Sequence, residues 1–214
     1  MSSADDGSFL RLRDLITGIA LPKQRKAWER DFEKTMVADE RRWRHIEATL
    51  IRLPDAAWQS LKATVLCQID LRHPARGWLQ AIPLLNEARA HDHLVRQGYH
   101  NVEFLPAQVH AKSPDLHATR DGKVLLCEVK TLRLGRQDSL AGNLPVKLAK
   151  RLGDAIEQLD AIGDAPNAAR MIYLVLDISD GLRPMADEIR ERIDILLEGI
   201  EMPGITIVLD EAAM

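Results

Sequence analysis

One stretch constrains the fold of this chain more than any other: residues 113–133, with the sequence SPDLHATRDGKVLLCEVKTLR. Its pattern predicts a turn, a short strand that starts at Asp115, an Asp-Gly reversal and a longer strand. Glu128 and Lys130 lie two positions apart near the end of the longer strand, so their side chains leave the same face. Apolar residues precede them on both faces, which is typical of a strand buried inside an α/β sheet. Buried charges are costly unless they pair or bind a metal, so we expect function at this end of the hairpin.

The chain changes character near residue 76. Residues 1–76 carry apolar side chains at helical spacing and few strand signals. The remainder predicts a helix, three strands, a helix, a strand, a helix and a strand, in that order. We therefore predict an α/β protein with an α+β mixed sheet in residues 77–214. Residues 1–76 are expected to form a helical arm or subdomain that packs on the core or dimerises.

Three helices are expected in the first part. A short one ends before Pro22, and a third one follows Pro54. Between Lys23 and Leu53 the apolar residues alternate steps of four and three, a heptad seam interrupted at Asp39. This pattern predicts one long amphipathic helix and a possible homodimer formed through the N-terminal helices.

The first helix of the second part carries an acid on its apolar stripe. Pro83 suits the first turn of this helix, and Gly98 suits the position just past its end. Glu87 shares a face with apolar residues at helical spacing. Either Glu87 has a function there, or it lies at the edge of the stripe with its carboxylate in solvent. The first strand is predicted over Val102–Val109.

Charge is distributed unevenly along the chain. The net formal charge is -3, yet residues 111–151 contain nine Lys or Arg and four Asp or Glu, a local balance of +5. This basic segment indicates a phosphate-binding surface, although an ordinary solvated face is the alternative. The N-terminus lacks a basic region followed by an apolar run, and no apolar stretch reaches about 18 residues. We expect a cytoplasmic protein without a membrane span.

Pro114-Asp115, followed after twelve intervening residues by Glu128-Val129-Lys130, resembles the motif of the PD-(D/E)XK nuclease superfamily. That superfamily includes type II restriction endonucleases, archaeal Holliday junction resolvases and many repair nucleases. The resemblance covers about residues 80–177 and implies a restriction-endonuclease-like αβββαβ core. We assign no counterpart in the superfamily to the helical residues before it.

The resemblance implies a role for each matching residue. Asp115 and Glu128 would bind a metal ion together with the backbone carbonyl of Val129, and Lys130 would orient or deprotonate the attacking water. Glu87 matches an acid of the first core helix that serves as a further ligand, directly or through water. Gln158, with Lys147 and Arg151 nearby, matches a polar residue of the following helix. The residues expected to contact nucleic acid are Arg120, Arg133, Arg136, Lys147, Arg151 and Gln158.

The chemistry of these residues is consistent with phosphodiester hydrolysis. Carboxylates and retained water are the ligands that Mg²⁺ prefers, and Mn²⁺ is expected to substitute. A divalent cation lowers the pKa of water and neutralises charge that develops on phosphate oxygens. We therefore expect a magnesium-dependent endonuclease or exonuclease that acts on DNA, with RNA not excluded.

Three other interpretations remain open. In the first, no metal is bound: Asp115 caps a turn, and Glu128 pairs with Lys130 or a neighbour for structural reasons alone. In the second, histidines make a zinc hydrolase, but the sequence has no HExxH motif and no cysteine pair. In the third, the nuclease fold serves as a catalytically inactive module for nucleic-acid binding or assembly.

Overall fold

The computed structural model describes residues 9–106, 113–135, 138, 142–161 and 168–211. Contacts between residues divide the chain into two compact units, one up to Asp92 and one from His93 onward. The sequence-based boundary after residue 76 falls inside a helix of the first unit. Arg136 and residues 107–109 of the predicted first strand lie outside the described residues.

The first unit is helical, as expected, and its helices surround an aromatic core. Trp28, Phe32, Trp43 and Trp78 are 0–3% exposed. The rings of Trp28 and Trp78 lie 4.6 Å apart, and those of Trp43 and Trp78 lie 4.9 Å apart, within the usual range for aromatic pairs. The helices of this unit are α1 (Leu10–Thr17), α2 (Pro22–Ala38), α3 (Glu40–Arg52), α4 (Asp55–Gln68), α5 (Pro74–Leu85) and the start of α6 (Glu87–Arg96).

The predicted long helix over Lys23–Leu53 is wrong, because Asp39 separates α2 from α3. Asp39 has non-helical backbone angles, φ -151° and ψ 62°, and its side chain accepts a hydrogen bond from the Arg42 N–H at 3.3 Å. This is the geometry of a helix N-cap. The apolar residues of the supposed seam, including Phe32, Trp43 and Leu50, are buried in the core of their own unit.

The predicted helix from Pro83 to Gly98 is also two helices. Pro83 lies inside α5 near its end, and Asn86 separates α5 from α6. Proline has no backbone N–H, so Pro83 removes the helical hydrogen bond to the Leu79 carbonyl near the end of α5. Gly98 follows α6 with φ +80°, so its predicted role as the residue past the helix end is confirmed.

The second unit contains a five-stranded mixed sheet in the order β1-β2-β3-β4-β5. The strands β1, β2 and β3 are antiparallel, whereas β4 and β5 run parallel to β3. The predicted element order and the α+β mixed sheet are confirmed. The strands are β1 (His100–Phe104), β2 (Leu116–Arg120), β3 (Lys123–Leu134), β4 (Ala169–Ile178) and β5 (Ile205–Glu211); the helices are α7 (Asn143–Asp160), α8 (Ala186–Glu198) and a 3₁₀ turn over Asp180–Met185.

The hairpin β2–β3 turns at Asp121-Gly122, as predicted. Both residues have positive φ, 53° and 73°, and Arg120 pairs with Lys123 across the turn. A two-residue turn of this kind matches the twist of the flanking strands. Because the turn fixes the register, it also determines which residues face each other at the far end of the hairpin.

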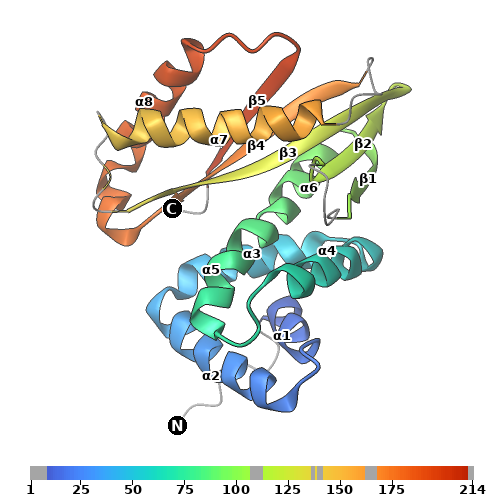
Figure 1. The fold of residues 1–214 in the computed structure, drawn as a ribbon, viewed down its shortest axis with the longest axis vertical. Helices are drawn as coiled ribbons and strands as arrows, with labels where there is room; N and C mark the ends of the chain where they lie inside the picture. The colour runs from blue at the N-terminus through green and yellow to red at the C-terminus, as the bar shows by residue number, and fades with distance from the viewer. Residues whose placement is uncertain (1–8, 107–112, 136–137, 139–141, 162–167, 212–214) are drawn as a thin grey trace. The chain divides into compact units, whose positions relative to one another are not determined.

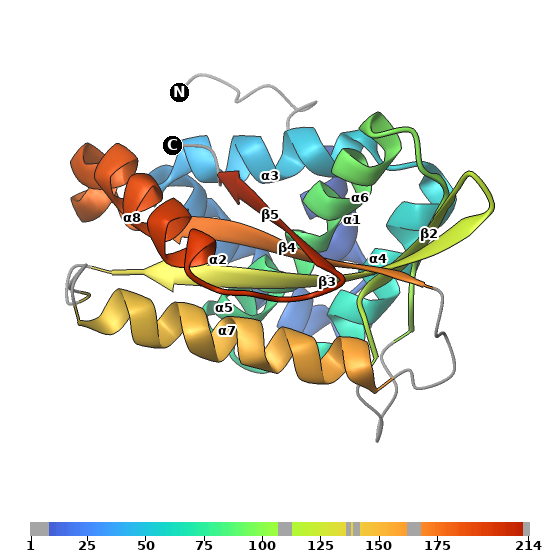
Figure 2. The same cartoon turned by 90° about the horizontal axis from the view of Figure 1, so that it is seen from above.

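Helix α7 covers one face of the sheet and runs along β3 in both views (Figures 1 and 2). Its apolar residues, among them Leu148, Leu152 and Leu159, share one buried cluster with β3, β4 and α8. Alternate residues of β3 and β4, such as Leu132 and Leu174, complete that cluster. The face of β3 that carries Glu128 and Lys130 is therefore the face toward α7.

No helix in the ranges that the structure describes is both long and apolar enough to cross a membrane.

Candidate active site

Asp115 and Glu128 face each other across the β2–β3 ladder. Leu116 pairs with Cys127, so the next pair of the antiparallel register joins Asp115 and Glu128. The Asp115 N–H donates to the Cys127 carbonyl at 3.1 Å, and Asp115 Oδ2 accepts the Val129 N–H at 2.7 Å. The aspartate side chain thus extends the ladder beyond the last strand pair and is held beside the glutamate.

Glu128 is fully buried, at 0% exposure, and only one of its oxygens is paired. Oε1 accepts a hydrogen bond from the Lys130 ammonium, whereas Oε2 has no hydrogen-bond partner among the residues described. Two ionised carboxylates have no proton to donate to each other. A proton shared with Asp115, or a cation between the two carboxylates, would satisfy the unpaired oxygen of Glu128.

Lys130 and Gln158 connect this pair to α7. The Lys130 ammonium donates to Gln158 Oε1, and Gln158 Nε2 donates to the Ser113 carbonyl at 3.3 Å. Gln158 therefore links β3, α7 and the segment before β2. The structure brings together five predicted site residues: Asp115, Glu128, Val129, Lys130 and Gln158.

The surroundings raise the pKa of both carboxyl groups. Burial raises the pKa of Glu128 to about 8, and the negative charge of Asp115 adds to this effect. Burial also raises the pKa of Asp115 to about 6, although the Val129 N–H and the Lys130 charge act in the opposite direction. Desolvation and a like charge together mark such a pair as a candidate functional site.

A histidine that the sequence interpretation did not assign to this site also faces it. His117 lies two residues beyond Asp115 on β2 and pairs with Leu126, so it shares the face of Asp115 and Glu128. Its Nδ1 is buried and has no hydrogen-bond partner within the described ranges. The alternation of β2 was the sequence signal that could have placed it there.

Within the second unit, the structure does not bring the other described predicted residues into this group; they are Arg120, Arg133, Lys147 and Arg151. Glu87 begins α6 in the first unit and is 6% exposed, so its carboxylate does not lie in open solvent. Arg120 lies at the opposite end of β2, where it donates to the Gln97 carbonyl at 3.2 Å and stacks 4.8 Å from the Tyr99 ring centre. Arg133, Lys147 and Arg151 line a separate pocket.

Asp115 and Glu128 do not form a complete metal site by side chains alone. In the parts of the chain that the structure describes, no three His, Cys, Asp or Glu side chains gather closely enough to hold a metal ion. Mg²⁺ often uses one or two carboxylates and takes its other ligands from water and phosphate oxygens. The Val129 carbonyl leaves the same edge of β3 as its N–H, toward Asp115. The unpaired Glu128 oxygen and this oxygen-rich donor set fit a hard divalent cation.

Comparison of the chain with protein-family models, with curated proteins and with solved structures found no match.

Proposed function

We propose that this protein is a Mg²⁺-dependent nuclease that hydrolyses phosphodiester bonds, most readily those of DNA, in the cytoplasm. The proposal combines the resemblance to the PD-(D/E)XK superfamily with the arrangement of Asp115, Glu128 and Lys130. The observation that carries it is the unpaired, fully buried oxygen of Glu128 beside a second carboxylate. A purely structural ion pair has no need for that second carboxylate, because Lys130 already pairs with Glu128.

Each residue has a distinct task in this proposal. Asp115 and Glu128 hold the cation once both have lost their protons, and Val129 contributes its carbonyl oxygen. Mg²⁺, or Mn²⁺ in its place, supplies Lewis-acid stabilisation of the phosphate charge and lowers the pKa of water. Gln158 fixes the Lys130 ammonium, so Nζ is positioned to orient the attacking water or exchange a proton with it.

A cleavage assay tests the proposal. Supercoiled, linear and single-stranded DNA are incubated with the protein in Mg²⁺, Mn²⁺ or EDTA, and RNA is tested in parallel. We expect cleavage with either cation and none in EDTA. The isosteric variants Asp115→Asn and Glu128→Gln should lower the rate at least about 100-fold, because they remove ligands. Lys130→Met should lower it roughly 10²–10⁴-fold.

The matched control is Asp121→Asn at the tip of the same hairpin. Asp121 has an 89% exposed side chain and a positive φ that asparagine also accepts, so this variant should cleave at the wild-type rate. Equal activity in wild type, Asp115→Asn and Lys130→Met would contradict the proposal.

The alternative is a catalytically inactive module for nucleic-acid binding or assembly. One observation favours it: Asp115, Lys130 and Gln158 already have hydrogen-bond partners within the protein. Nucleic-acid binding without cleavage under all the cation conditions above is the result that this alternative predicts.

A further inference from the structure

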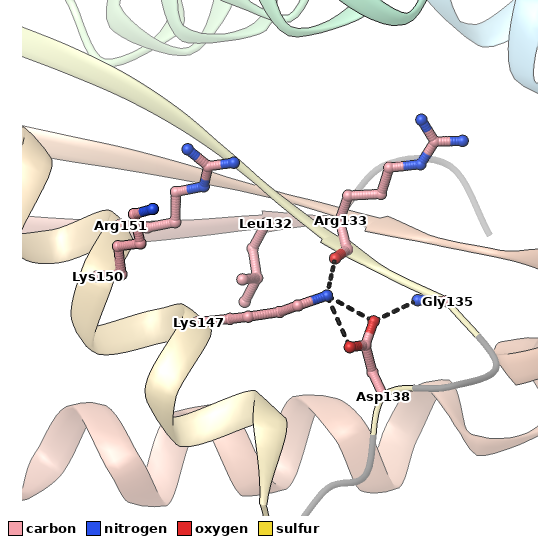
Figure 3. Close-up of a pocket in the computed structure, with 7 residues that line it drawn as sticks. All are labelled: Leu132, Arg133, Gly135, Asp138, Lys147, Lys150 and Arg151. Atoms are coloured by element: carbon pink, nitrogen blue, oxygen red, sulfur yellow. Dashed lines mark hydrogen bonds and ion pairs between the residues drawn. The ribbon is translucent and has the colours of Figure 1, made fainter.

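A pocket of about 380 Å³ lies between the end of β3 and the first half of α7. It is lined by Leu132, Arg133, Gly135, Asp138, Lys147, Lys150 and Arg151 (Figure 3). Four of these seven residues are cationic and one is anionic. The geometry of each charged group determines what the pocket can bind.

Lys147 and Asp138 form an ion pair in the pocket, and the net charge of this pair is zero. The Lys147 ammonium lies 2.7 Å from each oxygen of Asp138 and also donates to the Arg133 carbonyl at 3.4 Å. Asp138 also accepts the Gly135 N–H at 2.7 Å. This backbone hydrogen bond and the Lys147 ammonium lower the pKa of Asp138, so the pair stays ionised and its charges cancel.

Arg133 contributes its backbone rather than its charge. Its guanidinium extends away from Lys147 in Figure 3 and lies 3.7 Å from Asp177 of the neighbouring strand. Lys150 and Arg151, in contrast to Arg133, contribute their charges to the pocket. Both are exposed, and neither forms an ion pair with any residue in the described ranges. The pocket therefore contains two cations without an ion-pair partner among the described residues, Lys150 and Arg151, beside the neutral Lys147–Asp138 pair.

We propose that this pocket binds one phosphate group of the nucleic-acid strand, other than the phosphate that is cleaved, through Lys150 and Arg151. Two cations and a concave wall suit a phosphate, which has several acceptor oxygens and a full negative charge. The ligand class rests on the proposed function, whereas the pocket and its charges do not.

The pocket lies on the same face of β3 as the carboxylate pair, at a definite spacing. Leu132 is two residues beyond Lys130, about 7 Å along the strand. Arg151 is seven residues before Gln158, about 10 Å along the helix. Consecutive phosphates of one strand rise about 3.4 Å along duplex DNA, so the bound phosphate lies two or three nucleotides from the one at Lys130.

Binding in EDTA tests the pocket without requiring cleavage. Anisotropy of a labelled 20-base-pair DNA is measured from 50 to 200 mM KCl for wild type and for Lys150→Gln/Arg151→Gln. We expect the double variant to bind roughly tenfold more weakly at the lower salt concentration. The slope of log K against log salt should become about one unit shallower, because one phosphate contact is lost.

The matched control is Lys26→Gln/Arg30→Gln, which removes two exposed cations from one face of α2. It should leave both affinity and slope unchanged. A slope for Lys150→Gln/Arg151→Gln equal to that of wild type or the control overturns the inference, as does an absence of DNA binding by wild type. Thermal unfolding of each variant confirms that these exposed substitutions leave the fold intact.

Two further arms separate the possible outcomes. If the affinity loss occurs only with 5′- or 3′-phosphorylated DNA, the pocket takes a terminal phosphate; if it also occurs with unphosphorylated strands, it takes an internal one. Loss of binding in the double variant of a protein that never cleaves DNA would support the pocket and contradict the nuclease proposal. If the protein cleaves DNA but its DNA affinity does not depend on Lys150 and Arg151, the result would support the nuclease proposal and contradict the pocket.

Discussion

At the scale of single residues, the protonation and ion binding of Asp115 and Glu128 distinguish a structural role of this pair from a catalytic one. Asp115 satisfies the Val129 N–H and Glu128 satisfies Lys130, as a structural network would. The same two carboxylates are register partners with raised pKa values and one unpaired oxygen. Such a pair is unfavourable when both groups are ionised, unless a cation compensates the charge.

The raised pKa values predict how stability depends on pH. The pKa of Glu128 rises from 4.5 to about 8 and that of Asp115 from 3.8 to about 6, so the folded chain binds more protons than the unfolded chain between these limits. Stability from this pair is fully present below about pH 4 and is lost as the pH rises toward 8. Urea unfolding in EDTA at pH 5, 6, 7 and 8 should show this decline.

The variant Asp115→Asn/Glu128→Gln isolates the contribution of the pair, because other titrating groups are common to both proteins. The stability difference between this variant and wild type should grow in favour of the variant from pH 5 to pH 8. Saturating Mg²⁺ should stabilise wild type more at pH 8 than at pH 6, since the cation competes with the protons. A pH-independent difference between the two proteins would show that the carboxylates ionise normally.

The residue-scale features of the site followed from the sequence to a large extent. Alternation along β3 and the Asp-Gly turn together specified that Asp115 and Glu128 meet, because a turn of known length fixes the register. The helical spacing of Lys147, Arg151 and Gln158 placed them along one stripe of α7. The unpaired oxygen of Glu128 and the Asp138–Lys147 pair could not be predicted, since both depend on how side chains from distant segments pack.

At the scale of elements, two helical glycines predict opposite effects of the same substitution. A Cβ at Gly77 of α5 would lie 2.2 Å from the Trp28 ring, whereas a Cβ at Gly153 of α7 would meet no atom within 4 Å. Gly153→Ala should stabilise the protein by roughly 0.5–1 kcal/mol through helix propensity. Gly77→Ala should destabilise it by about 1–3 kcal/mol through overpacking. Urea unfolding measures the change in unfolding free energy for each variant. If both changes are stabilising, the Trp28 ring moves aside at little cost.

The start of α1 depends on a carboxylate from α3. Phe9 precedes α1 with φ 65° and offers no capping side chain, while Glu47 accepts the N–H groups of Arg11 at 2.7 Å and Leu12 at 3.0 Å. Glu47→Ala leaves these buried donors unpaired and should cost about 1–3 kcal/mol in unfolding free energy. The exposed Glu33→Ala should change it by less than about 0.5 kcal/mol.

Helix boundaries were the elements that the sequence predicted least well. The heptad spacing continued through Asp39, but the helix ends there, where the Asp39 carboxylate accepts a hydrogen bond from the Arg42 N–H. The break at Asn86 was missed because the apolar stripe continues across it. The close contact between Gly77 and Trp28 joins residues far apart in sequence, so no local pattern indicates it.

At the scale of the whole molecule, the first unit uses its apolar residues internally. Residues that suggested a dimer seam, such as Phe32 and Trp43, are at most 3% exposed. A homodimer through the N-terminal helices stays a prediction, and it would have to use the outer faces of these helices. Sedimentation velocity at two protein concentrations tests it directly.

The central claim is that Asp115 and Glu128 bind the divalent cation on which phosphodiester cleavage depends. A Mn²⁺ titration tests it most directly, with bound ion measured by electron paramagnetic resonance and DNA cleavage measured on the same samples. Wild type should bind Mn²⁺ and cleave in proportion to occupancy, while Asp115→Asn and Glu128→Gln should lose both and Asp121→Asn neither. Unchanged Mn²⁺ binding in Asp115→Asn and Glu128→Gln, or cleavage that does not follow occupancy, would contradict the claim.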